Sequence, residues 1–187
     1  MAILAGLLLA AGVTAASVSP ASAASVSPAS VSSASALQAP ASYVTEPLRN
    51  YHSDLCLGIS GGSKANGALA IQWTCNLAES QAWTWVPTTK GYVKGENVNS
   101  GKCLDVKGAS KAARASVIQY TCNGGRNQEW YPRIVSTGAI NVYNLVNRNS
   151  LMCLDVKGAS TSAGTVVIQY PCNGGSNQKW WVGRGSV

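Results

Sequence analysis

The sequence predicts an all-β protein in which three copies of one unit together form a single closed barrel. Three observations support this prediction: a motif that recurs after 47 and then 50 residues, six cysteines in three evenly spaced pairs, and short β-rich segments separated by turn residues. A repeat of this period indicates one supersecondary unit that is used several times. Short strands separated by Gly, Asn and Ser are typical of barrels and sandwiches.

The second and third copies are nearly identical, and the first is a diverged version of them. The octapeptide C-L-D-V-K-G-A-S begins at Cys103 and again at Cys153, and I-Q-Y, C-N-G-G and N-Q follow in both copies. The first copy begins at Cys56 with C-L-G-I and keeps I-Q-W, C-N and Q-A-W. The repeat region covers residues 43–187, and its copies span about 43–90, 91–138 and 139–187.

The segment ahead of the first copy predicts a secretory leader followed by a linker. Residues 2–16 are small and apolar, and this length suits the apolar part of a signal peptide better than a membrane span of roughly 20 residues. Ala21-Ser22-Ala23 fits a cleavage site, so we expect a signal peptide over residues 1–23, with a disordered Ala-rich leader as the alternative. Residues 24–42 are mostly Ser, Ala, Val and Pro, which predicts a linker.

All charged residues lie from Glu46 onward, so the net charge of +7 belongs to the repeat region. A basic surface can favour acidic polysaccharide, a membrane or nucleic acid. The basic residues are scattered, however, whereas nucleic-acid binding calls for basic stripes with interleaved aromatics. We therefore expect no nucleic-acid partner, no membrane span in the mature protein, and a solvent-exposed position for Lys107 and Lys157.

The cysteines predict one disulfide in each copy. Each pair is separated by 19 residues, and only pairing within a copy respects the repeat. In a secreted chain each such bond would contribute about 3 kcal/mol by the loop-entropy model. Zinc is the competing interpretation, but close C-x-x-C pairs are absent and His52 is the only histidine, so we expect no metal and no cofactor. The predicted pairs are Cys56–Cys75, Cys103–Cys122 and Cys153–Cys172.

Strand-like segments of about four per copy would surround one shared core. The tryptophan of each Q-x-W motif, Trp83, Trp130 and Trp180, is expected to point into that core. Because only seven residues follow Trp180, the third copy is expected to lack its last strand, and Tyr43–Thr45 would replace it by pairing near the end of the chain. The strongest strand patterns cover Ala68–Trp73, Val117–Tyr120, Ile140–Val146 and Val166–Tyr170.

Together these motifs resemble the ricin-type β-trefoil lectin domain. The resemblance rests on C-L-D, Q-aromatic-x-C-N and Q-x-W in matched register with the cysteine pairs, and it covers residues 43–187. In its motifs the chain is similar to the carbohydrate-binding modules of family 13, which are often attached to secreted bacterial glycoside hydrolases. The resemblance implies a β-trefoil with three pseudo-threefold repeats, and a secreted, extracellular protein that binds sugars without catalysis.

The resemblance also implies shallow sugar pockets, up to one in each repeat. In the second copy, Asp105 would accept hydrogen bonds from two sugar hydroxyls and Tyr120 would stack on the sugar ring. Asn127 would bond a further hydroxyl, and Gln128 would support the pocket. The third copy repeats these roles at Asp155, Tyr170, Asn177 and Gln178.

The chemistry of a pyranose accounts for this set of residue types. An aromatic ring covers its apolar face, a carboxylate accepts strong hydrogen bonds from its rim, and an amide both donates and accepts. The first copy departs from the set, since it has Gly58 in place of the aspartate and Ser80 in place of the asparagine. We expect that copy to be structural, which leaves two working sites for avidity on a polymer.

Other interpretations of the same residues remain. The aspartates and asparagines could stabilise turns, and the tyrosines could belong to the core. Catalysis is not expected, because His52 has no nucleophile motif around it and the equivalent carboxyls Asp105 and Asp155 belong to different repeats. A secreted protein-binding module, such as a protease inhibitor, is the alternative function. Galactose-, xylose- or arabinose-, and mannose-containing glycans all fit the expected pocket.

Overall fold

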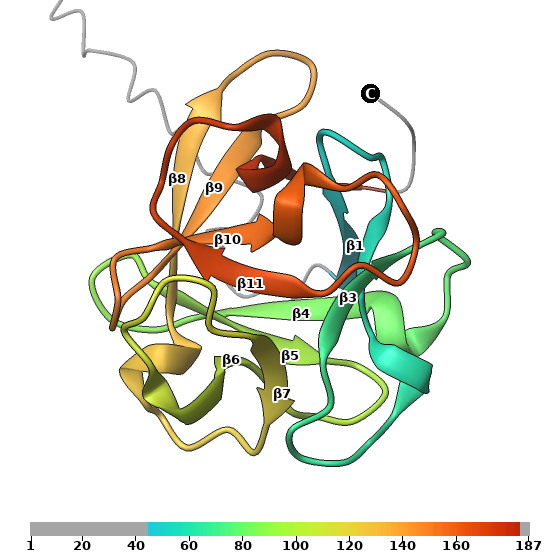
Figure 1. Ribbon diagram of the computed structural model, residues 1–187. Coiled ribbons are helices and arrows are strands. Elements are labelled where there is room, and N and C mark those ends of the chain that lie inside the picture. The colour runs from blue at the N-terminus through green and yellow to red at the C-terminus, as the bar shows by residue number, and fades with distance from the viewer. Residues whose placement is uncertain (1–44, 184–187) are drawn as a thin grey trace, which may run out of the picture. The chain divides into compact units, whose positions relative to one another are not determined.

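The structure, a computed structural model, describes residues 45–183, which form β-strands joined by loops and short 3-10 turns (Figure 1). The expected signal peptide (1–23) and linker (24–42) lie outside the described residues. No helix in residues 45–183 is long and apolar enough to cross a membrane. The strands are β1 (Thr45–Asn50), β2 (Cys56–Ile59), β3 (Ala70–Trp73), β4 (Ala82–Pro87), β5 (Val93–Asn97), β6 (Cys103–Val106), β7 (Val117–Tyr120), β8 (Trp130–Ser136), β9 (Val142–Asn147), β10 (Cys153–Val156), β11 (Val167–Tyr170) and β12 (Trp180–Val182).

Six of these strands form a closed antiparallel ring. β1 pairs with β4, β4 with β5, β5 with β8, β8 with β9, β9 with β12, and β12 again with β1. Ring closure satisfies the backbone groups that an open sheet would expose at its edges. Each repeat contributes its first and fourth strand to this ring, which confirms the β-trefoil expected from the sequence.

The ring closes through the N-terminal strand, as expected, but through residues beyond the expected segment Tyr43–Thr45, of which Tyr43 and Val44 lie outside the described residues. Leu48–Asn50 of β1 face Trp180–Val182 of β12, whereas Thr45 pairs with Thr84 of β4. The expectation that the third copy lacks a strand is wrong, because β9 to β12 supply all four. Each copy begins with a strand that precedes its first cysteine, so no strand is missing after Trp180.

The remaining strands form three hairpins, β2/β3, β6/β7 and β10/β11, each paired over four residues. Single bridges join the hairpins to one another around the pseudo-threefold axis: Leu69 with Ile118, Ile71 with Val166, and Ser116 with Ile168. One disulfide per repeat ties the start of each hairpin to the loop that follows it. The three bonds join Cys56 to Cys75, Cys103 to Cys122 and Cys153 to Cys172, as the spacing predicts.

The three Q-x-W tryptophans lie in the core, as expected. Trp83, Trp130 and Trp180 have no exposed surface. Each indole Nε1 donates to the carbonyl of a leucine in the same repeat, at 3.0, 3.1 and 3.0 Å, so the buried polar group is satisfied. The cores of all three repeats therefore have the same arrangement, and this arrangement supports the hairpins that carry the pockets.

Candidate functional site

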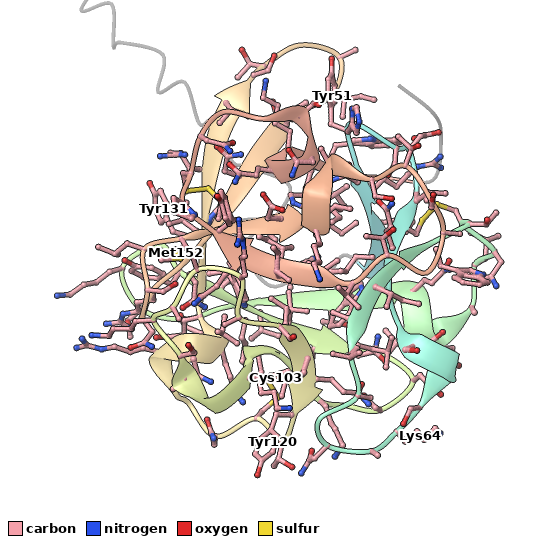
Figure 2. All side chains as sticks on the ribbon, viewed as in Figure 1. Tyr51, Lys64, Cys103, Tyr120, Tyr131 and Met152 are labelled. Carbon is pink, nitrogen blue, oxygen red and sulfur yellow. A yellow bond between two sulfur atoms is a disulfide. The ribbon has the colours of Figure 1, made fainter. Side chains whose placement is uncertain are left out.

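The structure brings the predicted residues of the second repeat together around one pocket. Asp105 lies on β6, Tyr120 ends β7, and Asn127 and Gln128 belong to the 3-10 turn η4 (Arg126–Gln128). Asp105, Tyr120 and Asn127 line the pocket. Tyr120 is 42% exposed and its ring points outward (Figure 2), as a stacking platform requires.

Two amides hold the Asp105 carboxylate through one of its oxygens. Oδ2 accepts a hydrogen bond from Asn127 Nδ2 at 2.8 Å and another from Gln128 Nε2 at 2.9 Å. Both bonds end on the same atom, so within the described residues Oδ1 is left to accept from a ligand in the pocket. Gln128 does not line the pocket, and its amide also bonds Thr121 and Asn123 of the adjoining loop.

Burial raises the pKa of the Asp105 carboxyl above its ordinary value of 3.8, because the charged form loses solvation. The hydrogen bonds from Gln128 and Asn127 favour the charged form and oppose this shift. The pKa of Asp155 is raised in the same way, with Gln178 and Asn177 as the opposing donors. The folded protein therefore keeps both carboxylates partly desolvated at a cost in free energy. Such perturbed groups are common at functional sites.

The third repeat forms an equivalent pocket. Asp155 on β10, Tyr170 at the end of β11 and Asn177 on η6 (Ser176–Gln178) line it. Gln178 Nε2 donates to Asp155 Oδ2 at 2.8 Å, as Gln128 does to Asp105. Asn177 Nδ2 donates to the carbonyl of Val156 at 3.1 Å. The repeated sequence thus produces two pockets of the same design.

The first repeat keeps a pocket but not its carboxylate. Gly58, Trp73 and Ser80 line it, and Trp73 is 46% exposed. Gln81 keeps its structural bonds, because its amide accepts from the N–H of Asn76 and donates to a carbonyl of the same loop. A Cβ on Gly58 would stand 3.0 Å from Cγ of Gln81, so a larger side chain there would displace the glutamine. This pocket offers an aromatic face without a charged acceptor.

Sequence reasoning missed one wall of every pocket, which comes from another repeat. Asn66 and Gly67 of the first repeat line the second pocket, Arg114 of the second lines the third, and Gly164 of the third lines the first. In Figure 2, Lys64 of the first-repeat loop and Tyr120 of the second repeat lie on the same lower side of the molecule.

Buried glutamines of the I-Q-aromatic motif hold these loops in place. Gln119 Nε2 donates to the carbonyls of Ser63 and Ala65, and Gln72 and Gln169 hold the other two loops in the same way. The recurring I-Q dipeptide was the one sequence feature that pointed to these contacts. The carbonyls that Gln119 bonds, however, lie more than fifty residues away in the chain.

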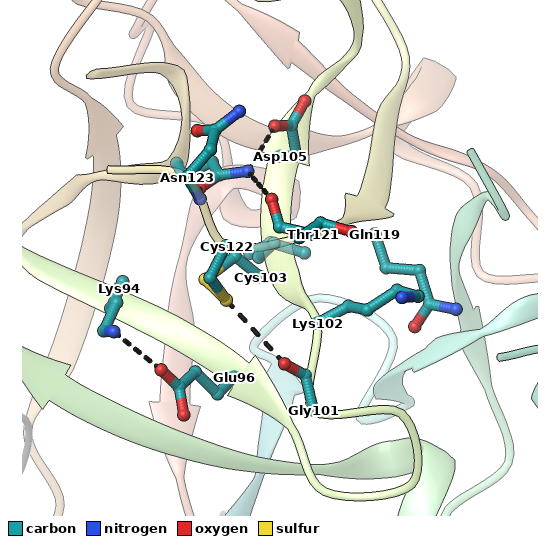
Figure 3. The surroundings of a disulfide bond; sticks show 12 residues. Lys94, Glu96, Gly101, Lys102, Cys103, Asp105, Gln119, Thr121, Cys122 and Asn123 are labelled. Carbon is teal, nitrogen blue, oxygen red and sulfur yellow. Dashed lines mark hydrogen bonds and ion pairs between the residues drawn. A yellow bond between two sulfur atoms is a disulfide. The ribbon is translucent and has the colours of Figure 1, made fainter. Parts of the chain in front are cut away.

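The disulfide of the second repeat lies close to its pocket. Figure 3 shows Asp105 and Thr121 near the bond between Cys103 and Cys122. Glu96 and these two sulfurs lie within 4.8 Å of one another, but the sulfurs are bonded together and Glu96 is paired with Lys94 at 2.7 Å. The bond therefore anchors β6 beside the carboxylate, and its sulfurs offer no thiolate to a metal.

Comparison with known proteins places the chain in a family. The family model described as ricin-type beta-trefoil lectin domain-like matches residues 37–120, 79–170 and 133–187. The chain belongs to this family. No curated protein matches this lectin-like chain, whereas many solved structures do.

Three solved structures illustrate the likeness. The designed threefold-symmetric protein ThreeFoil is 41% identical, with a TM-score of 0.70 over 75% of this chain and 98% of that one. An exo-β-1,3-galactanase from Clostridium thermocellum is 37% identical, with a TM-score of 0.73 over 78% of this chain and 31% of that one. A Macrolepiota procera ricin B-like lectin, solved with lactose, is 21% identical, with a TM-score of 0.66 over 77% and 97%. The lectin-like chain thus spans less than a third of the galactanase.

Proposed function

We propose that this protein is a secreted, non-catalytic carbohydrate-binding module that holds glycans in the pockets of its second and third repeats. The observation that carries the proposal is the arrangement of each pocket carboxylate. In the second repeat, one oxygen of Asp105 is fixed by two amides, and Asp105 lines the pocket together with the exposed ring of Tyr120. A fixed acceptor next to an aromatic face matches the polar rim and apolar face of a pyranose.

The sugars bound are proposed to be units of a polysaccharide, and galactose-containing polymers are the first candidates. The galactanase that shares 37% identity with this chain acts, by its description, on a β-1,3-galactan. Xylose-, arabinose- and mannose-containing glycans are compatible with the same pocket chemistry. Each pocket is shallow, so we expect affinities near the millimolar end of the scale, and two pockets together gain avidity on a polymer.

The first repeat is proposed to contribute little to binding. Trp73 offers a stacking face, but Gly58 supplies no acceptor, and charge-assisted bonds are the stronger ones. Catalysis is not proposed, since Asp105 and Asp155 line separate pockets and a glycosidase needs two carboxyls across one bond. Three disulfides suit the oxidising environment outside a cell.

A glycan array probed with the repeat region, followed by titration of the best ligand, tests this function. Binding to immobilised polysaccharide that free oligosaccharides compete away supports the proposal. Perturbation of the Tyr120 and Tyr170 ring signals in NMR spectra would locate the ligand at the two pockets. Failure to bind any glycan, together with inhibition of a secreted protease, would favour the alternative of a protein-binding module.

A further inference from the structure

The wall that each pocket takes from another repeat differs at one position. This position is Gly67 in the first repeat, Arg114 in the second and Gly164 in the third. Each of these residues donates its backbone N–H to the carbonyl of the buried glutamine in the hairpin it contacts, at 2.9, 2.8 and 2.8 Å. Their spacing of 47 and 50 residues equals that of the repeats. They are therefore the same position of the fold.

Arg114 occupies a backbone conformation that suits glycine. Its φ is +69°, and the φ of Gly67 and of Gly164 is +85°. A residue with a Cβ adopts this left-handed region at an energetic cost, and arginine has no short polar side chain to offset it. Other non-glycine residues, such as Ala109 and Leu151, also have a positive φ, so a role for Arg114 rests on what its side chain contacts.

The Arg114 side chain extends to the third pocket. Its guanidinium carbon lies 5.8 Å from the centre of the Tyr170 ring, and both residues line the pocket with Asp155 and Lys157. A guanidinium placed against an aromatic face is attracted to the ring and keeps N–H donors at its edges. Those donors form a planar fork that fits a carboxylate or sulfate.

The three pockets consequently differ in charge. Among the described residues that line the first pocket, none is charged, and the lining of the second pocket contains one carboxylate, Asp105, and one cation, Lys107. The third pocket has two cations, Arg114 and Lys157, against the single carboxylate of Asp155. Of these three pockets in residues 45–183, the third therefore has an excess of positive charge in its lining, and the other two do not.

We propose that Arg114 determines the specificity of the third pocket, which binds a sugar carrying an anionic substituent. The pyranose would occupy the Asp155 and Tyr170 side of the pocket, and its carboxylate or sulfate would accept hydrogen bonds from the guanidinium edge. The second pocket, which has Gly67 at the equivalent position, binds neutral sugars. This inference rests on the proposed carbohydrate binding and adds the ligand's charge to it.

The test uses the full chain with Asp105→Asn, which removes the second pocket's carboxylate so that the third pocket dominates binding. Affinity is measured for glucuronoxylan and for the same polymer after its carboxyls are reduced, at low and at physiological ionic strength. A sulfated galactan and its desulfated form make up a second arm, which separates carboxylate from sulfate recognition. Arg114→Gly is the test variant, and it should fold, since the other two repeats have glycine there.

We expect the acidic polymer of at least one arm to bind about five- to tenfold more tightly than its neutral form at low salt, and less so at higher salt. Arg114→Gly should abolish this preference, and Arg114→Lys should keep part of it. The matched control is Arg126→Ser, which removes the same charge from an exposed residue and introduces the residue that the third repeat has there, Ser176. In a chain with Asp155→Asn, Gly67→Arg should give the second pocket the same preference.

Three results with the substituted proteins would overturn the inference. The first is an unchanged preference in Arg114→Gly, and the second is an equal loss in the Arg126→Ser control. The third is tighter binding of the neutral polymers by Arg114→Gly with the acidic-to-neutral ratio unchanged, which would mean that Arg114 only covers the ring. If the Asp105→Asn chain with Arg114 intact binds neutral glycans without any preference for charge, this inference alone fails as well. If the unaltered chain binds no glycan of either kind, the proposed function also fails.

Discussion

Replacing both pocket aspartates by asparagine should abolish glycan binding and leave the fold intact. In the variant Asp105→Asn/Asp155→Asn, each new side-chain oxygen can accept the amide bonds that now end on Oδ2. The new amide group then turns a donor toward the pocket, where the sugar hydroxyls need an acceptor.

The expected magnitudes differ for binding and for stability. Hydrogen bonds to a charged acceptor contribute about 1.5–3 kcal/mol, so each pocket should lose about ten- to a hundredfold in affinity. The free energy of unfolding should change by only about 1 kcal/mol, because the hydrogen bonds persist and the buried charge is removed. The melting temperature should accordingly move by only a few degrees.

Titration with the best glycan of the array and thermal unfolding by circular dichroism measure the two quantities. Glu79→Gln/Glu96→Gln is the matched control, since it removes two carboxylates outside the pockets and should bind like the unaltered protein. Binding of the aspartate variant at unaltered affinity would refute the proposed role of the carboxylates. Equal loss in the control would show that net charge, and not the pockets, governs binding.

The pocket carboxyls, one disulfide and one glycine give four further predictions. Because burial raises the pKa of both pocket carboxyls above 3.8, glycan affinity should fall with decreasing pH at a midpoint above that value, and titrations over a pH series would show it. The same shift makes these groups most favourable to folding below pH 3.8 and less so as pH rises through the raised pKa, so the asparagine variant should lose this part of the pH dependence of unfolding. Cys103→Ser/Cys122→Ser should cost about 3 kcal/mol in urea unfolding and should weaken the second pocket more than the third. Gly95→Ala should destabilise the protein by about 1–3 kcal/mol, as urea unfolding would also measure, since its Cβ would stand 2.8 Å from the buried Trp85 ring.

The architecture follows from the sequence because the same local pattern occurs three times. The predicted strand Val117–Tyr120 coincides with β7, and the cysteine spacing predicts the disulfides. The expectation about the third copy fails because its first strand, β9, precedes Cys153 and its fourth strand, β12, begins at Trp180, so no strand is missing. The sequence does predict β9, as Ile140–Val146, and the error lay in counting the strand after each Q-x-W motif with the preceding copy.

The candidate site is predictable only in part. Asp105, Tyr120 and Asn127 recur as a set, and their residue types by themselves indicate sugar chemistry. The wall that contains Arg114 could not be predicted, because it depends on contacts between repeats. Its positive φ has a sequence signal, since the repeat spacing aligns Arg114 with Gly67 and Gly164.

The position of β1 between β4 and β12 has a consequence for biosynthesis. The N-terminal strand of the ring cannot find its second neighbour until Trp180–Val182 have been made, after all three repeats have been translated. Long-range pairings of this kind form late and slowly. The barrel should therefore close only once β12 has emerged from the ribosome, after every other strand of the ring has been made.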